Sequence, residues 1–211
     1  MGTLFRLIRL IWFRWTWIKT NRHNLTIPKK LFDPNCVKIG RFTYGPLNIF
    51  TYGAENEFLE IGEFVSIGSG VKFILGGNHS TKSFSTYPFK VKLFNESNES
   101  TSKGPIIIKD DVWIGTDSII LSGVTIGQGA VIGAGTVVSK DIPPYAIAIG
   151  NPAQIVKYRF DEDTRKKMIK FNYSNLNKNV ISDKISFLYR DLDDEIINEL
   201  SNNEIKINLK N

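Results

Sequence analysis

The most regular feature of the chain is a spacing of six between aliphatic positions in its second half. From residue 106 the sequence divides into the hexads IIIKDD, VWIGTD, SIILSG, VTIGQG, AVIGAG and TVVSKD. The first position of each hexad is aliphatic or small, and glycine or a polar residue recurs near the end. The third position is always aliphatic: Ile108, Ile114, Ile120, Ile126, Ile132 and Val138. The same spacing occurs upstream at Ile61, Ile67 and Phe73.

A period of six predicts short strands joined by tight corners. Helical solenoids repeat over tens of residues, whereas one strand and one turn fit six. Three such units make one triangular coil, and coils stack at the strand spacing of ~4.8 Å. The third-position aliphatics then form one buried column, in which each contributes roughly 1.5–3 kcal/mol. The pattern predicts an all-β solenoid, a parallel β-helix, over residues 31–158, but the period alone does not fix its hand.

The hexad register breaks around a histidine. The position six after Phe73 is His79, and the distance from Phe73 to the next aliphatic column residue, Ile108, is not a multiple of six. Residues 77–105 are therefore predicted to leave the coil as an extruded loop. A long excursion from a repetitive fold is usually functional.

The two ends of the chain lack the repeat. Residues 1–30 form a basic segment with seven Lys or Arg and no Asp or Glu. Within residues 4–18, one helical face carries Leu, Ile and Trp and the opposite face carries arginines, which is typical of an amphipathic helix in a membrane interface. Residues 159–211 contain two segments with helix signals, DEDTRKKMIKF and DLDDEIINEL, and are predicted to form a C-terminal helical region.

An alternative for the N-terminal helix remains open. Its other side is apolar as well, through Leu10, Phe13 and Trp17. Such a helix can close the end of the core or pack on a neighbouring subunit instead of lying on a membrane.

Charge and composition exclude several classes of function. Outside residues 1–30 acidic and basic residues nearly balance, so no basic groove is expected and nucleic acid is not a predicted partner. The single cysteine, Cys36, permits no internal disulfide and indicates a reducing, cytoplasmic location. The chain has two histidines, whereas a catalytic zinc site of the three-histidine type needs three, and no metal is predicted.

Three stretches carry a family resemblance: LEIGEFVSIGSGV, the loop sequence GGNHSTKSFSTYPF, and the run from IKDDVWIG to GNPAQIVKYRF. Together they span about residues 36–172, and they resemble the hexapeptide acyltransferases of the xenobiotic-acetyltransferase branch, which includes type B chloramphenicol and streptogramin A acetyltransferases. The resemblance implies a left-handed parallel β-helix, a homotrimer, and transfer from acetyl-CoA in a cleft between subunits. Three features depart from the drug-modifying members: the stretch FNYSN at 171–175, the short region 44–60, and the basic, Trp-rich N-terminus. In these features the chain resembles instead relatives that acetylate sugars of capsule and O-antigen.

His79 is the predicted catalytic base. Acyl transfer from a thioester needs a base for the acceptor's proton, a positioned donor and stabilisation of the oxyanion. Imidazole exchanges a proton readily near neutral pH, and general-base help is worth ~10²–10⁴ in rate. A loop histidine with a structural role is the alternative, but the register break and the matched motif, whose histidine is catalytic in the family, favour the base. His23 is interpreted as a surface or packing residue.

The remaining predicted site residues are cofactor contacts, which follow from the resemblance to related sugar acetyltransferases, and acceptor contacts, which are candidates by residue type. The predicted cofactor contacts are Thr116, Ala134, Ser139, Lys140, Lys157 and Arg159. Lysine suits phosphate as a point charge, whereas each small residue is equally explained as a corner of the coil. The predicted acceptor contacts are Asn78, Tyr44 and Tyr87; a tyrosine can pack against a sugar face, or fill a trimer interface.

Three functions are consistent with these features. The first is an acetyl-CoA-dependent O-acetyltransferase acting on a sugar hydroxyl of a bacterial surface polysaccharide or its precursor. The second keeps the enzyme and makes the acceptor an antibiotic, chloramphenicol or streptogramin. The third is a non-enzymatic solenoid that serves as a scaffold or glycan-binding module. The expected location is the cytoplasm, where the N-terminal helix would allow association with the inner face of the membrane.

Overall fold

The computed structural model describes residues 2–192 and Ile196, and it divides the chain into two compact units that meet between Lys157 and Tyr158. The second unit contains the short helices α3 (Glu162–Met168), α4 (Lys178–Asp183) and α5 (Ile185–Leu188). Most of the helix predicted in DLDDEIINEL lies outside the described residues. The helices among the described residues include none that is long and apolar enough to cross a membrane.

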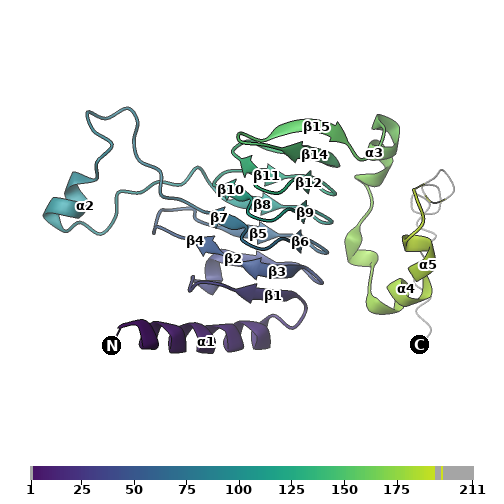
Figure 1. The fold of residues 1–211 in the computed structure, drawn as a ribbon, viewed down its shortest axis with the longest axis horizontal. Coiled ribbons are helices and arrows are strands. Elements are labelled where there is room, and N and C mark those ends of the chain that lie inside the picture. Colours follow the sequence, from purple (N-terminus) through teal and green to yellow (C-terminus); the bar gives the residue numbers. More distant parts are fainter. Residues whose placement is uncertain (1, 193–195, 197–211) are drawn as a thin grey trace. The chain divides into compact units, whose positions relative to one another are not determined.

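The strands are two to five residues long and lie in three sheets (Figure 1). Sheet A consists of β1 (Leu25–Pro28), β3 (Tyr44–Leu47), β6 (Ser66–Ile67), β9 (Trp113–Ile114), β12 (Val131–Ile132), β14 (Ala146–Ile149) and β15 (Gln154–Tyr158). Sheet B consists of β2 (Val37–Ile39), β5 (Leu59–Ile61), β8 (Ile106–Ile108) and β11 (Thr125–Ile126). Sheet C consists of β4 (Ile49–Phe50), β7 (Lys72–Ile74), β10 (Ile119–Leu121) and β13 (Val137–Val138).

The chain visits the three sheets in a fixed rotation. Strands β8, β9 and β10 belong to sheets B, A and C, and the next three strands return to the same sheets in the same order. Each new strand pairs in parallel with the one before it in its sheet. The result is a three-sided coil of stacked parallel strands, as the period of six predicts. Strand β1 pairs with β3, so the parallel strands begin at Leu25, inside the segment 1–30 that we expected to precede the solenoid.

The interior of the coil is the predicted aliphatic column. The third-position residues of the six hexads are each at most 1% exposed. The first-position residues are buried as well: Ile106, Val112, Ser118, Val124, Ala130 and Thr136. The two hydroxyls in this set are satisfied at corners, because Ser118 Oγ donates to the Gly115 carbonyl at 2.8 Å and Thr136 Oγ1 accepts from the Gly150 N–H at 3.2 Å.

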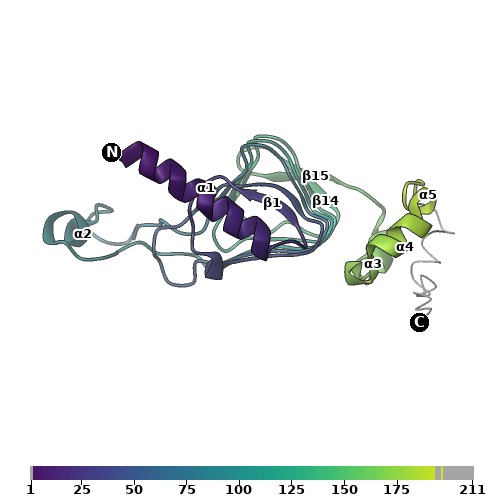
Figure 2. The same ribbon diagram turned by 90° about the horizontal axis from the view of Figure 1, so that it is seen from below.

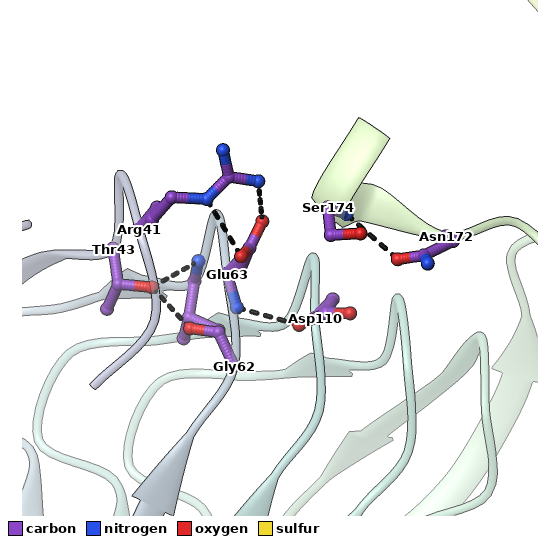
Figure 3. A network of polar contacts seen from close by, with 8 residues as sticks. Arg41, Thr43, Gly62, Glu63, Asp110, Asn172 and Ser174 are labelled. Carbon is purple, nitrogen blue, oxygen red and sulfur yellow. Dashed lines mark hydrogen bonds and ion pairs between the residues drawn. The ribbon is translucent and has the colours of Figure 1, made fainter. Parts of the chain in front are cut away.

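Corners between sheets B and A are linked from coil to coil by polar side chains (Figure 3). Arg41 Nε and Nη2 donate to the two carboxylate oxygens of Glu63 at 2.9 and 2.6 Å. The backbone N–H of Glu63 donates to Asp110 Oδ1 in the following coil at 2.7 Å. Thr43 Oγ1 donates to the Gly62 carbonyl at 2.7 Å. These bonds run along the stack and hold three successive coils together at one edge.

Helix α1 (Gly2–Thr20) packs on β1 at one end of the coil (Figures 1 and 2). Trp17 is 3% exposed, and its Nε1 donates to Thr26 Oγ1 at 3.0 Å. The ring of Phe32 meets Trp17 and Phe13 edge-on, at 5.2 and 5.0 Å between centroids. Arg14 Nε donates to the Pro28 carbonyl at 2.7 Å. The helix therefore closes the end of the core with the apolar side that carries Phe13 and Trp17.

Candidate active site

The loop that joins β7 to β8 begins and ends at the corner between sheets C and B. It carries helix α2 (Phe89–Phe94) and projects on the side away from sheet A (Figures 1 and 2). Asn78 and Thr101 form an antiparallel bridge, in which each backbone N–H donates to the other's carbonyl at 3.0 and 2.9 Å. We call Asn78 together with residues 101–104 the neck of the loop.

The neck is bound to the turn between β10 and β11. Asn78 Nδ2 donates to the Thr101 carbonyl at 3.1 Å and to Ser122 Oγ at 3.3 Å. Ser122 is buried and also accepts from the Lys103 N–H at 3.3 Å. Gly123 has φ +79°, and a Cβ there would lie 2.8 Å from the Lys103 carbonyl oxygen, so the close approach of the neck requires glycine. The base of the loop is thus fixed to the coil.

His79 directly follows the bridged residue Asn78, and its side chain is exposed in the single chain. Among the residues that the structure describes, no hydrogen-bond partner is found for its imidazole. The backbone of the neck, rather than a contact of the ring, therefore sets where this histidine lies. Its placement next to a fixed point of the coil leaves the ring available to a bound molecule.

The predicted cofactor contacts of the coil fall at two corners. Thr116 and Ala134 are exposed at successive levels of the corner between sheets A and C, where a Cβ on Gly115 would lie 2.5 Å from the Ala134 nitrogen. Ser139 and Lys140 are exposed after β13, at the corner between sheets C and B that also holds the neck. The two groups therefore flank sheet C, and one of them shares a corner with His79.

The other two predicted cofactor residues lie elsewhere. Lys157 is exposed on β15, at the edge of sheet A, and so at neither of these corners. Arg159 belongs to the second unit, where its guanidinium group lies over the Phe160 ring at 5.1 Å from the centroid.

The predicted acceptor residues are not brought together within one chain. The side-chain amide nitrogen of Asn78 donates within the neck, to the Thr101 carbonyl and Ser122 Oγ, so only its amide oxygen is left to contact an acceptor. Tyr44 is 51% exposed on sheet A, in register with Ser66 and, one strand further, Trp113. Tyr87 lies in the loop, with its ring edge-on to Phe89 at 5.1 Å.

Sequence reasoning missed the residues that hold the neck. Ser122 occupies a hexad position that is polar in many repeats, so its residue type carries no signal. The position of Ser122 is informative, however. Ile74 pairs with Leu121, so Ser122 is aligned with Leu75, where the chain leaves the coil. A polar residue one coil beyond a register break is therefore a candidate to fix the base of the loop.

Two other residues with reactive side chains, His23 and Cys36, have surroundings that favour a packing role over a catalytic one. His23 Nε2 lies 2.9 Å from the Ile39 carbonyl oxygen, consistent with the packing role predicted for it. Burial raises the pKa of the Cys36 thiol, and the carboxylates of Asp33 and Glu57 raise it further, so the thiol is protonated at neutral pH and a poor nucleophile. Within residues 2–192 and 196 no group of three His, Cys, Asp or Glu side chains is arranged to hold a metal.

A three-sided coil of six-residue units with a histidine-bearing loop at one corner is the architecture of a hexapeptide-repeat transferase. Residues 105–140 match the family model described as bacterial transferase hexapeptide (six repeats). The chain is also 39% identical over 158 residues to a chloramphenicol acetyltransferase of Agrobacterium fabrum, covering 66% of this chain and 75% of the relative. It belongs to the hexapeptide-repeat acetyltransferase family.

Two solved structures show the same relationship. A hexapeptide-repeat acetyltransferase of Vibrio cholerae, complexed with acetyl-CoA, matches with a TM-score of 0.52 and 30% identity, over 72% of this chain and 79% of that one. A galactoside acetyltransferase in complex with coenzyme A matches with a TM-score of 0.50 and 29% identity, over 72% and 73% of the two chains. The fold prediction and the family resemblance agree with these relatives.

Proposed function

We propose that this acetyltransferase moves the acetyl group of acetyl-CoA to a hydroxyl of a small acceptor, with His79 as the general base. The imidazole would accept the hydroxyl proton while the acceptor oxygen attacks the thioester carbonyl carbon. The carbon–sulfur bond then breaks, and the thiolate of coenzyme A takes the proton from the imidazolium, so that ester and free thiol are formed. The observation that carries the proposal is the exposed imidazole beside a neck that is fixed to the coil.

For the cofactor we propose the corners on either side of sheet C. Thr116, Ala134 and Ser139 present small exposed side chains that let an extended pantetheine chain approach the backbone. Lys140 supplies a positive charge for a phosphate at the same corner as His79. Lys157 and Arg159 remain proposals for further phosphate contacts.

We further propose that the coil is left-handed and that three chains assemble with the active site between neighbours, as the family resemblance implies. Sheet A supports a subunit contact, because Leu25, Tyr44 and Trp113 lie in one outward register and are each more than half exposed. Exposed apolar side chains aligned in this way are typical of a surface that another chain covers. A neighbouring chain would also supply groups around His79 that one chain does not.

For the acceptor, the comparisons favour an antibiotic over the surface glycan that we expected first. The relative at 39% identity is named a chloramphenicol acetyltransferase. We therefore propose a chloramphenicol-like acceptor, a compact molecule with a free hydroxyl, for which Tyr87 and Phe89 of the loop offer aromatic contacts. A sugar hydroxyl is the second candidate, because the galactoside acetyltransferase matches over 72% of the chain.

The test is an acceptor panel with acetyl-CoA and the full chain, followed by release of the thiol. We expect chloramphenicol to be acetylated, and His79→Ala to lower kcat by about 10²–10⁴ without changing the unfolding temperature. His23→Ala is the matched control: it removes a contact to Ile39 worth about 0.5–1.5 kcal/mol of stability and leaves kcat unchanged.

Each other outcome has a defined meaning. Acetylation of a galactoside but not chloramphenicol would replace the antibiotic by the sugar as acceptor. Equal rates in the wild type and His79→Ala would exclude His79 as the base. An absence of acetyl-CoA binding would contradict the enzymatic proposal and favour the scaffold alternative.

A further inference from the structure

Helix α1 carries an apolar face that the coil does not use. Its packed side is formed around Phe13 and Trp17, which contact Phe32. The residues with side chains 52–68% exposed are Leu4, Phe5, Leu7, Ile8, Ile11, Trp12, Trp15 and Ile18. With helical spacing these eight residues occupy one continuous side of the helix. A face this apolar and this exposed marks a contact surface.

The rotation of the helix on the coil is fixed by polar contacts. Trp17 Nε1 is bonded to Thr26, and Arg14 Nε is bonded to the Pro28 carbonyl. Both bonds lie on the side that faces β1, so they hold the eight apolar residues outward. The helix therefore cannot rotate to bury the outward face against the coil without breaking both bonds.

The charge around this face has a single sign. Arg6, Arg9 and Lys19 are exposed on the helix, and residues 1–30 contain no acidic residue. Arg9 lies over the ring of Phe5 at 5.9 Å and Lys19 over the ring of Trp15 at 5.0 Å, so both cations adjoin the apolar face. A partner that covers the face must accept hydrophobic side chains and offer negative charge beside them.

We propose that the outward face of α1 docks on the surface of a membrane that contains anionic lipids, with the helix axis parallel to the surface. In such helices the apolar side chains enter the boundary between headgroups and acyl chains by about 5–10 Å. Tryptophan favours that boundary, and arginine and lysine attract anionic headgroups. A second copy that packs face to face through the same helix fits less well, because it would bring the same cations together without an acidic counterpart.

This inference does not depend on the proposed acceptor. The docking residues lie at the end of the coil that β1 forms, whereas His79 follows the neck at the turn between β10 and β11. Loss of membrane binding and loss of acetyl transfer are therefore separable in one set of variants.

Co-sedimentation of the full chain with lipid vesicles tests the proposal. We expect binding to vesicles of phosphatidylcholine with phosphatidylglycerol, and much weaker binding to phosphatidylcholine alone. The double variant Ile8→Asp and Trp12→Asp should bind at least about tenfold more weakly, because charged groups are excluded from the apolar boundary. The matched control is Phe84→Asp with Leu93→Asp, which adds the same charges to exposed apolar positions of the loop.

The charge requirement has its own variants. Replacing Arg6 and Arg9 by Gln should weaken binding to the anionic vesicles by about fivefold per arginine at low salt. Lys90→Gln with Lys92→Gln, on helix α2, is the control for net charge and should have little effect. Circular dichroism and thermal unfolding of every variant confirm that the fold is retained.

Three results would overturn the proposal. One is a wild-type protein that does not bind anionic vesicles. Another is an equal loss of binding in the loop control and the helix variant. The third is a fall in molar mass by light scattering for Ile8→Asp with Trp12→Asp together with unchanged vesicle binding by that variant, which would assign the face to contacts between copies.

Discussion

The coil and the loop between β7 and β8 are held in place in different ways. In the coil, the position of a residue within its hexad decides whether it is buried, and burial repeats from Ile108 to Val138. In the loop, a few hydrogen bonds at the neck, from Asn78 to Thr101 and Ser122, fix the base. Stability is thus spread over many equivalent residues in one region, whereas the candidate chemistry depends on a few unique ones in the other.

The comparison indicates why a repetitive fold suits an enzyme. Each coil repeats the support of the coil before it, so one corner can depart from the repeat while its neighbours keep the register. The pairing of β7 with β10 continues on the coil side of the loop, and β8 resumes the pairing with β5. His79 can therefore lie outside the repeat without loss of the column beneath it.

The largest expected effect on stability contrasts the two regions directly. Ile120→Ala should lower the free energy of unfolding by about 2–5 kcal/mol, because it empties a fully buried position of the column. Phe84→Ala removes a fully exposed ring of the loop, and should change the free energy of unfolding by less than about 0.5 kcal/mol. Urea unfolding of both variants measures the contrast. Similar values for the two would contradict the assignment of stability to the coil.

A smaller effect is expected where the two regions are joined. Asn78→Ala removes the side-chain bonds to Thr101 and Ser122, and should lower stability by about 1 kcal/mol. Because the bonds fix the base of the loop, kcat should also fall and limited proteolysis of the loop should become faster. Ser97→Ala, at an exposed position of the same loop, is the control and should change neither quantity. Unaltered proteolysis of Asn78→Ala would argue against the neck as the fixed point.

The smallest effect is expected outside both regions, at the start of α3. The Thr164 N–H and hydroxyl donate to Asp161, at 2.9 and 2.8 Å, and lower the pKa of that carboxyl below its usual value. The cap therefore stabilises α3 above the usual pKa of aspartate, and the stabilisation is lost as pH falls through the lowered pKa. Asp161→Ala should reduce helix content at neutral pH and match the wild type in acid.

Circular dichroism over a pH series measures this difference. Asp161→Asn keeps a capping oxygen and removes the titration, so it should hold helix content nearly constant across the series. A wild-type protein whose α3 content shows no change in acid would contradict the role of the carboxylate. The coil should be unaffected in all three proteins, which keeps this effect apart from the first two.

Much of the fold follows from the sequence because burial in the coil has a period. The third-position residues and the place of the loop can be read from spacing alone, since a strand of two or three residues leaves little freedom in register. Strand β1 was not expected, because Leu25–Pro28 is a single short strand with no hexad beside it. A single strand without an adjacent hexad shows no period of six, so the pattern does not identify it.

The site and the N-terminal helix were less predictable. Both sides of α1 are apolar, so the pattern gives its two faces but not which of them meets the coil; packing of Trp17 against Phe32 and Thr26 decides that. The side-chain amide nitrogen of Asn78 bonds within the neck, a contact that the sequence did not predict, and the role of Asn78 toward an acceptor stays a prediction. Contacts between residues far apart in the chain determined both outcomes, and spacing along the chain does not report them.

The neck has a consequence for how this enzyme can diversify. Because both ends of the loop are clamped to the same turn of the coil, and Asn98 and Ser100 also bond to Gly53 and Tyr52, insertions or deletions between Ser80 and Ser97 need not displace the imidazole or the strands. With His79 as the proposed base, related chains can therefore differ in the outer part of the loop, and so in the acceptor that we propose it contacts, while the position of the imidazole stays the same.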